Sequence, residues 1–193
     1  MKALFCFIYI CLKIAYAINT TSINNRSSRT CGTGNPQSRI ELVEYGDFEC
    51  PHCGRAYPLV KRIQEELREN VKVIFRNFPL TKVHPHAKLA AVAAEAAAQQ
   101  GKFWEMHAML FEHQRNLLRH AIIDYAANIS LNTELFVAGL DNEELSKKVD
   151  KQFMSGLRSG VNQTPGFFIN GERYLESWEG DQLYRYLVAL FMK

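Results

Sequence analysis

The sequence predicts an α/β fold in which a group of helices interrupts a mixed β-sheet. Residues 40–78 show strand, helix and strand patterns in turn, which is typical of two parallel strands joined by a crossover helix. Residues 84–160 carry helical periodicity throughout, and the chain then returns to a short strand pair and a last helix. The predicted order is β-α-β, a helical insertion, and β-β-α.

The first predicted strand, residues 40–45, carries an acidic side chain on each face. Glu44 shares a face with Ile40 and Leu42, whereas Glu41 lies on the opposite face. If the strand is central and covered on both sides, a carboxylate must be buried or line a site. The alternative is that both acids lie near strand ends in water, and the pattern alone leaves the two interpretations open.

A helix is predicted from Ala56 to Leu67, where apolar residues recur at helical spacing, and Pro58 is expected to kink it near its start. Residues 71–78 are β-branched and aromatic, which predicts a second strand parallel to the first.

Further helices are predicted over residues 87–100, 103–111 and around 118–125, the first of them ending at a glycine. Asp141 with Glu144 resembles a capping box, which predicts the start of another helix.

Residues 167–169 and 172–174 are separated by Asn170 and Gly171, the residues of a two-residue hairpin turn, so an antiparallel pair is expected. An amphipathic helix over residues 183–191 follows. This order of elements is that of a thioredoxin fold with an embedded helical domain. We expect the thioredoxin fold over residues 39–80 and 161–193, and the helical insertion domain over residues 81–160.

Composition indicates one ordinary globular unit of 193 residues, with 47% hydrophobic and 22% charged residues. The net charge of +3 is small and the basic residues are scattered, which argues against nucleic-acid binding.

The N-terminal residues 1–17 resemble a secretory signal peptide with a basic start, an apolar run and a small-x-small site ending at Ala17. This pattern predicts export to the periplasm or another extracytoplasmic compartment after cleavage near Ala17. Residues 18–38 are polar and predict a flexible leader. Cys31 lies in this leader, either as an exposed cysteine without a role or in a regulatory or intermolecular disulfide.

The tetrapeptide Cys50-Pro51-His52-Cys53 lies between the first predicted strand and its helix. Two cysteines at this spacing on a first helical turn can form a short-range disulfide, and the helix N-terminus favours the thiolate of the first. The imidazole of His52 can donate a hydrogen bond or a positive charge to that sulfur. The motif therefore predicts a thiol–disulfide site, with Cys50 as exposed nucleophile and Cys53 as buried resolving thiol.

Two functions of other classes use the same residues. In a metal-binding protein, the cysteines would be ligands, but a structural zinc site needs four and no second Cys-x-x-Cys exists. His84 and His86 could supply nitrogen ligands, although we interpret them as solvated loop residues. We therefore expect no metal and no other cofactor. In a redox-inactive peptide-binding module, both cysteines would have no use, which disfavours that alternative.

Three segments, residues 46–53, 75–80 and 161–171, occur in the order seen in the DsbA-like thiol–disulfide oxidoreductases, and the chain resembles this family from Arg39 to its C-terminus. The resemblance implies that Pro165 follows a cis peptide bond and faces the active-site disulfide. It implies that Thr164 offers backbone hydrogen bonds to a bound peptide. It also implies that Glu44 occupies a buried acidic position from which it relays a proton to or from Cys53.

The resemblance further implies an exported enzyme that transfers its Cys50–Cys53 disulfide to unfolded or partly folded cysteine-containing proteins. A membrane protein that reoxidises the pair is an implied partner. Isomerases and reductases use the same kind of site and are the alternative. We expect a monomeric oxidase, because the short polar leader does not resemble a dimerisation domain. Gln163 and Gly166 depart from the residues common in relatives, so substrate preference stays open.

Overall fold

The structure is a computed structural model that describes residues 32–192. The predicted signal peptide (1–17), the leader up to residue 31 and Cys31 lie outside the described residues.

A five-stranded mixed sheet forms the centre of the fold, with strand order β1-β3-β2-β4-β5. The strands are β1 (Gly32–Thr33), β2 (Ile40–Gly46), β3 (Val71–Asn77), β4 (Gly166–Ile169) and β5 (Glu172–Arg173). β2 and β3 are parallel and the other three pairs are antiparallel, which confirms the predicted β-α-β unit and the hairpin. β1 lies within the range predicted as a flexible leader, and its backbone groups pair with the edge of β3.

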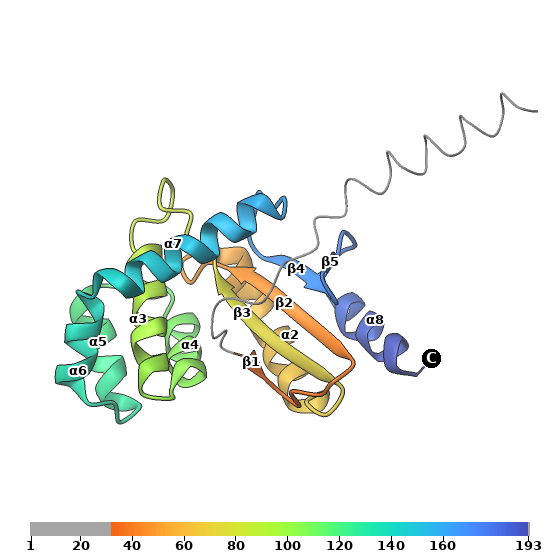
Figure 1. Cartoon of the computed structure of the whole chain (residues 1–193), viewed down its shortest axis with the longest axis horizontal. Coiled ribbons are helices and arrows are strands. Elements are labelled where there is room, and N and C mark those ends of the chain that lie inside the picture. The colour runs from red at the N-terminus through yellow and green to blue at the C-terminus, as the bar shows by residue number, and fades with distance from the viewer. Residues whose placement is uncertain (1–31, 193) are drawn as a thin grey trace, which may run out of the picture.

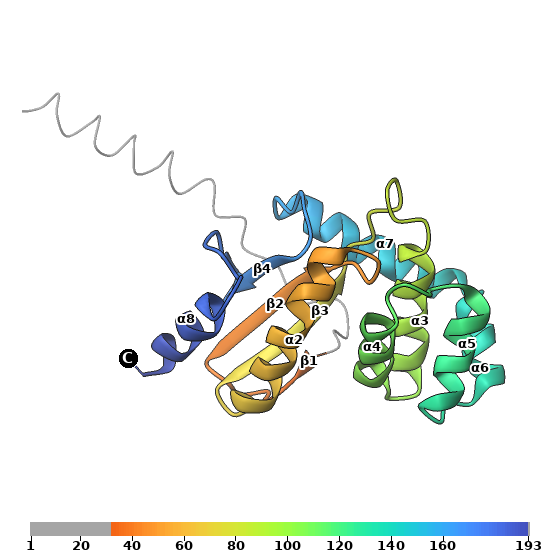
Figure 2. The ribbon, with the colours of Figure 1, turned by 180° about the vertical axis from the view of Figure 1, so that it is seen from behind.

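The two faces of the sheet are covered by different helices (Figures 1 and 2). α2 (Pro51–Glu66) and α8 (Gln182–Phe191) pack against one face. Their buried side chains, among them Ile63 and Leu187, form one apolar cluster with Leu42 of β2. Because side chains alternate along a strand, Glu44 points to this same face, toward α2.

The remaining helices lie between β3 and β4 in the sequence and gather at one end of the sheet (Figure 1). They are α3 (Ala87–Gln99), α4 (Phe103–Glu112), α5 (Arg119–Asn128), α6 (Thr133–Leu140) and α7 (Glu143–Arg158). We call them the helical segment. They all fall within residues 81–160, and the treatment of that range as a separate domain stays a prediction.

Two details of the helical segment differ from the prediction. α6 was not predicted, because its eight residues make barely two turns and show little periodicity. The cap of α7 is Asn142 rather than Asp141, since the Asn142 side chain accepts from the backbone N–H groups of Glu144 and Leu145.

α7 connects the helical segment to the second face of the sheet. The Phe153 ring lies 4.5 Å from the Phe78 ring, centroid to centroid. A Cβ on Gly156 would lie 2.6 Å from the Phe78 ring, so only glycine permits this close approach. Within residues 32–192, no helix combines the length and hydropathy needed to cross a bilayer.

Candidate active site

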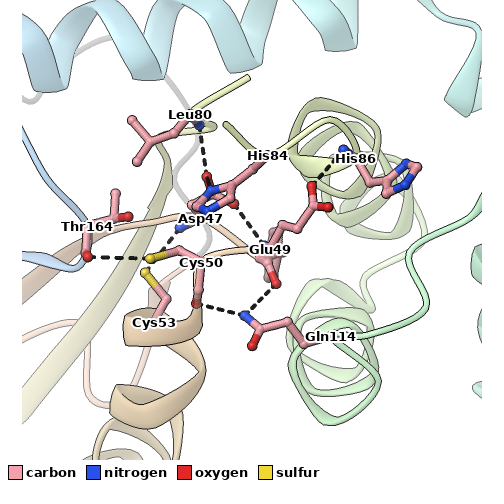
Figure 3. A network of polar contacts seen from close by, with 10 residues as sticks. Asp47, Glu49, Cys50, Cys53, Leu80, His84, His86, Gln114 and Thr164 are labelled. Atoms are coloured by element: carbon pink, nitrogen blue, oxygen red, sulfur yellow. Dashed lines mark hydrogen bonds and ion pairs between the residues drawn. The ribbon is translucent and has the colours of Figure 1, made fainter. Parts of the chain in front are cut away.

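The two motif cysteines lie where β2 passes into α2 (Figure 3). Cys50 is the N-cap of α2, Pro51 opens the helix, and Cys53 lies in its first turn. Proline fits this first position because its missing N–H would have no partner in the helix. Both cysteines are buried free thiols, so the prediction of an exposed Cys50 is wrong: 5% of its surface is accessible, against 0% for Cys53.

The environment of Cys50 favours its thiolate. The pKa of Cys50 is lowered from 9.0 to about 5, first by the hydrogen bond from the Cys53 thiol, against a smaller opposing effect of burial. The Thr164 side chain and the backbone N–H groups of Cys53 and His52 lower it further. At neutral pH, Cys50 is therefore an anion held by donors at the helix N-terminus.

Cys53 has the opposite preference. Its pKa is raised well above 9.0, first by burial, then by its hydrogen bond to Cys50 and by the charges of Glu44 and Cys50. The backbone N–H of Asp47 opposes these effects by donating to the Cys53 sulfur at 3.4 Å. The pair thus shares one proton, which resides on Cys53.

Glu44 is buried, with 2% of its surface exposed, so the solvated alternative is wrong for this residue, and it interacts electrostatically with both cysteines. Its Oε1 has no hydrogen-bond partner among the described residues. Burial, and then the charge on Cys50, raises the pKa of Glu44 from 4.5 to about 8. Glu41, on the other face, is half-buried and pairs with Lys72 at 3.3 Å.

The loop before β4 brings Thr164 and Pro165 to Cys50. The Thr164–Pro165 peptide bond is cis, as the resemblance implied. The Thr164 carbonyl oxygen lies 3.6 Å from Sγ of Cys50 and can accept a hydrogen bond only when Cys50 is a protonated thiol, so this loop backbone lies directly beside the nucleophile (Figure 3).

The His52 ring does not occupy the place that the sequence suggested. His52 is exposed, and its Nδ1 lies 2.8 Å from a guanidinium nitrogen of Arg55, which can only donate. The contribution of His52 to the Cys50 thiolate comes from its backbone N–H. Helix geometry explains this, since the N-cap faces the N–H groups of the first turn.

Sequence reasoning missed Asp47 as a site residue and misjudged His84. The Asp47 carboxylate is fully buried and pairs with Nδ1 of His84 at 2.8 Å. It also accepts the backbone N–H groups of Glu49 and Leu80, both at 2.8 Å. The prediction of a solvated His84 is wrong, because 18% of its side chain is exposed and its ring is bonded to Asp47 (Figure 3).

Gln114, which follows α4, also holds the loop before Cys50. Its Nε2 donates to the carbonyl oxygens of Phe48 and Cys50, each at 2.8 Å. A Cβ on Gly54 would lie 2.4 Å from Oε1 of Gln114, so the absence of a side chain at Gly54 leaves room for Gln114. No pattern near the motif could have indicated Gln114, because its partners lie more than sixty residues away along the chain.

This arrangement suits dithiol–disulfide exchange. It provides a stabilised thiolate, a protonated second thiol within reach, a buried carboxyl group that can exchange a proton, and an adjacent backbone edge for a peptide. Among the described residues, no three His, Cys, Asp or Glu side chains are grouped to hold a metal ion.

Comparisons with known proteins agree with this geometry. Residues 26–188 match the family model described as Thioredoxin. A thioredoxin-like oxidoreductase from Silicibacter pomeroyi is similar in structure, with a TM-score of 0.75, 24% identity, and coverage of 86% of this chain and 95% of that one. The thiol–disulfide exchange protein alpha-DsbA2 of Wolbachia pipientis gives a TM-score of 0.77 at 20% identity, covering 90% and 96%.

Curated relatives carry a different name. The chain is 37% identical over 158 residues to the Na(+)/H(+) antiporter NhaA 1 of Salinispora arenicola, and 40% identical over 141 residues to NhaA 3 of Salinispora tropica. These matches cover 82% and 73% of this chain but 24% and 22% of those proteins, so the chain spans about a quarter of their length. From the family match and the fold, the chain belongs to the thioredoxin family and has the fold of the DsbA-like thiol–disulfide oxidoreductases.

Proposed function

We propose that this chain is a protein disulfide oxidoreductase that transfers its Cys50–Cys53 disulfide to cysteines of folding proteins. The observation that carries the proposal is the opposite shift of the two thiols. The pKa of Cys50 is lowered to about 5, while that of Cys53 is raised well above 9.0. A thiolate that is stable in the reduced enzyme is a good leaving group, which favours the donation of disulfides.

The transfer proceeds in two exchanges. A substrate thiolate attacks Sγ of Cys50, a bond forms between these sulfurs, and the Cys50–Cys53 bond breaks. Cys53 leaves with the electron pair and takes a proton, for which the Glu44 carboxyl is suited because its pKa is raised to about 8. A second substrate thiolate then attacks the substrate sulfur, and Cys50 leaves as its stable thiolate.

Substrate binding is proposed at the loop that carries Thr164 and Pro165. The Thr164 carbonyl lies beside Cys50, so an extended peptide on this backbone edge would present its cysteine to the nucleophile. The partners would be unfolded or partly folded proteins and a membrane protein that reoxidises the pair. Monomeric action outside the cytoplasm is also proposed, and that location depends on the signal-like residues 1–17.

An isomerase or reductase is the alternative that shares this chemistry. A reductase needs a poorer leaving group at the first cysteine, so the lowered pKa of Cys50 favours the oxidase.

Trapping of the mixed disulfide tests the assignment of roles. Cys53→Ser, mixed with a reduced unfolded protein and oxidised glutathione, is expected to accumulate a covalent complex on non-reducing gels, because Cys53 can no longer resolve it. Cys50→Ser is the matched control and should form none, provided that Cys6, Cys11 and Cys31 are replaced by serine in both variants. Equal complexes with both variants, or none with Cys53→Ser, would overturn the assignment.

A further inference from the structure

Asp47 connects two separate parts of the chain around the active site. Its buried carboxylate accepts the N–H of Glu49, next to the motif, through Oδ1. Its Oδ2 accepts two donors from the loop after β3, the backbone N–H of Leu80 and Nδ1–H of His84, both at 2.8 Å. The carboxylate can only accept, so the imidazole nitrogen is the donor. Three charge-assisted hydrogen bonds thus fix Asp47 in place.

The backbone of the same residue contacts a reacting atom. The N–H of Asp47 donates to Sγ of Cys53 at 3.4 Å. Cys53 is buried and its sulfur carries negative charge whenever it leaves Cys50 or attacks it. A fixed N–H donor at that sulfur stabilises this charge without having to reorient, as a preorganised dipole does in other reactions.

Among the three donors to the Asp47 carboxylate, only His84 contributes through its side chain, so only this contact can be removed by a substitution. The backbone donors from Glu49 and Leu80 persist whatever their side chains are, whereas the contact from His84 depends on its ring. The turn that carries His84 is already closed by backbone bonds from Val83 and His84 to the Leu80 carbonyl. The imidazole is therefore not needed to form the turn.

We propose that His84, through the Asp47 carboxylate, positions the Asp47 N–H on the Cys53 sulfur and so accelerates the steps in which Cys53 carries charge. This inference rests on the proposed exchange at Cys50 and Cys53. His84 and the Asp47 side chain are positioning residues, because they act on the sulfur through the Asp47 backbone.

The step concerned is the resolution of a mixed disulfide. The Cys53 thiolate attacks Sγ of Cys50, a Cys50–Cys53 bond forms, and the bond from Cys50 to the foreign sulfur breaks. The foreign group leaves with the electron pair as a thiolate, and the Cys53 proton passes to the buried carboxylate of Glu44 or to water. No further oxidant is needed, because the mixed disulfide supplies the oxidising equivalents.

Stopped-flow reaction of the reduced protein with 5,5′-dithiobis(2-nitrobenzoate), in a chain whose Cys6, Cys11 and Cys31 are replaced by serine, separates Cys50 from Cys53. The first nitrothiobenzoate is released when Cys50 attacks the reagent, at a rate that rises with reagent concentration. The second is released when Cys53 resolves the adduct, at a rate independent of reagent. His84→Ala is expected to slow the second phase about tenfold, the rate equivalent of one weakened hydrogen bond, and to leave the first within about twofold.

Two matched variants distinguish positioning from general damage. His84→Asn places an amide N–H near the position of Nδ1 and should restore most of the second phase. His86→Ala alters a neighbouring ring whose residue contacts the site through its backbone N–H, and should change neither phase. An unchanged second phase in His84→Ala, an equal fall of both phases, or no restoration by His84→Asn would overturn the inference. If the wild-type protein releases only one nitrothiobenzoate, the proposed exchange fails instead.

Discussion

Two buried glutamates, one in the sheet and one in the helical segment, occupy very different environments. Glu44 and Glu95 are each 2% exposed. Glu95 accepts from Asn77 at 3.1 Å and from Gln152 at 2.7 Å, and it pairs with Lys148 at 2.6 Å. The Glu44 Oε1 has no such partner among the described residues. A buried carboxylate surrounded by donors keeps elements together, whereas one without donors is held ready to take or give a proton.

The position of each residue explains the difference. Glu95 lies on α3, and its partners come from α7 and the end of β3, so its contacts join the helical segment to the sheet. Glu44 lies in the central strand β2, close enough to both cysteines to interact with them electrostatically, and its Oε1 has no hydrogen-bond partner among the described residues. The molecule thus separates the acid that joins its elements from the acid that the proposed exchange would use.

The largest expected effect concerns pH. The Glu44 pKa is raised from 4.5 to about 8, so the folded reduced protein binds a proton that the unfolded chain releases. The stability of the wild-type protein relative to Glu44→Gln should be constant below pH 4.5, fall as pH rises to about 8, and then level off, a loss of about 5 kcal/mol. Urea denaturation of both proteins under reducing conditions, from pH 4 to 9, measures it. A flat difference would mean that Glu44 is not desolvated.

Replacement of Glu95, the buried acid of the helical segment, should have the next largest effect. Glu95→Leu removes the acceptor of the Gln152 amide, the ion-pair partner of Lys148 and one of two acceptors of the Asn77 amide, which should lower the free energy of unfolding by about 3 kcal/mol. Glu95→Gln keeps the amide contacts and should cost less. Urea denaturation measures the loss, and both thiol reaction phases should stay near wild type. A large change in thiol reactivity would contradict the conclusion that Glu95 stabilises the fold without affecting the cysteines.

Glu44→Gln should slow exchange without weakening the fold at neutral pH. Glutamine cannot exchange a proton with Cys53, so the resolving step should slow by about tenfold or more. Rapid-mixing kinetics of the second thiol phase measure this step, with Glu41→Gln as the control on the opposite face. An unaltered rate would show that water carries the proton instead.

The smallest effect is expected at His52. Its ring contacts Arg55 rather than the Cys50 sulfur, so His52→Ser should raise the Cys50 pKa by less than about one unit. Thiolate absorbance against pH measures it. A larger rise would show that the His52 imidazole stabilises the Cys50 thiolate, as the sequence suggested.

Local patterns predicted much of this molecule. The Cys50–Cys53 motif, the strand-helix-strand order and the hairpin each occupy a short stretch whose residue types determine the local structure. The burial of Glu44 was half-predicted, because alternation placed it on an apolar face but could not show whether a helix covers that face.

The parts that were missed depend on contacts between distant segments. Asp47 and His84 meet across 37 residues, and Gln114 reaches the Cys50 carbonyl across 64. A histidine beside a proline in a loop is typical of a solvated residue, and only the approach of the Asp47 carboxylate makes His84 different. The placement of the His52 ring likewise depends on the neighbouring Arg55 rotamer, which the motif does not contain.

The most direct test of the central claim is the reduction potential of the Cys50–Cys53 pair, measured by equilibration against a glutathione redox series. The lowered pKa of Cys50 stabilises the reduced form and predicts a value between about −120 and −180 mV, that of a disulfide donor or isomerase. A value near about −270 mV or lower would mark a thioredoxin-like reductant and would contradict the oxidase assignment.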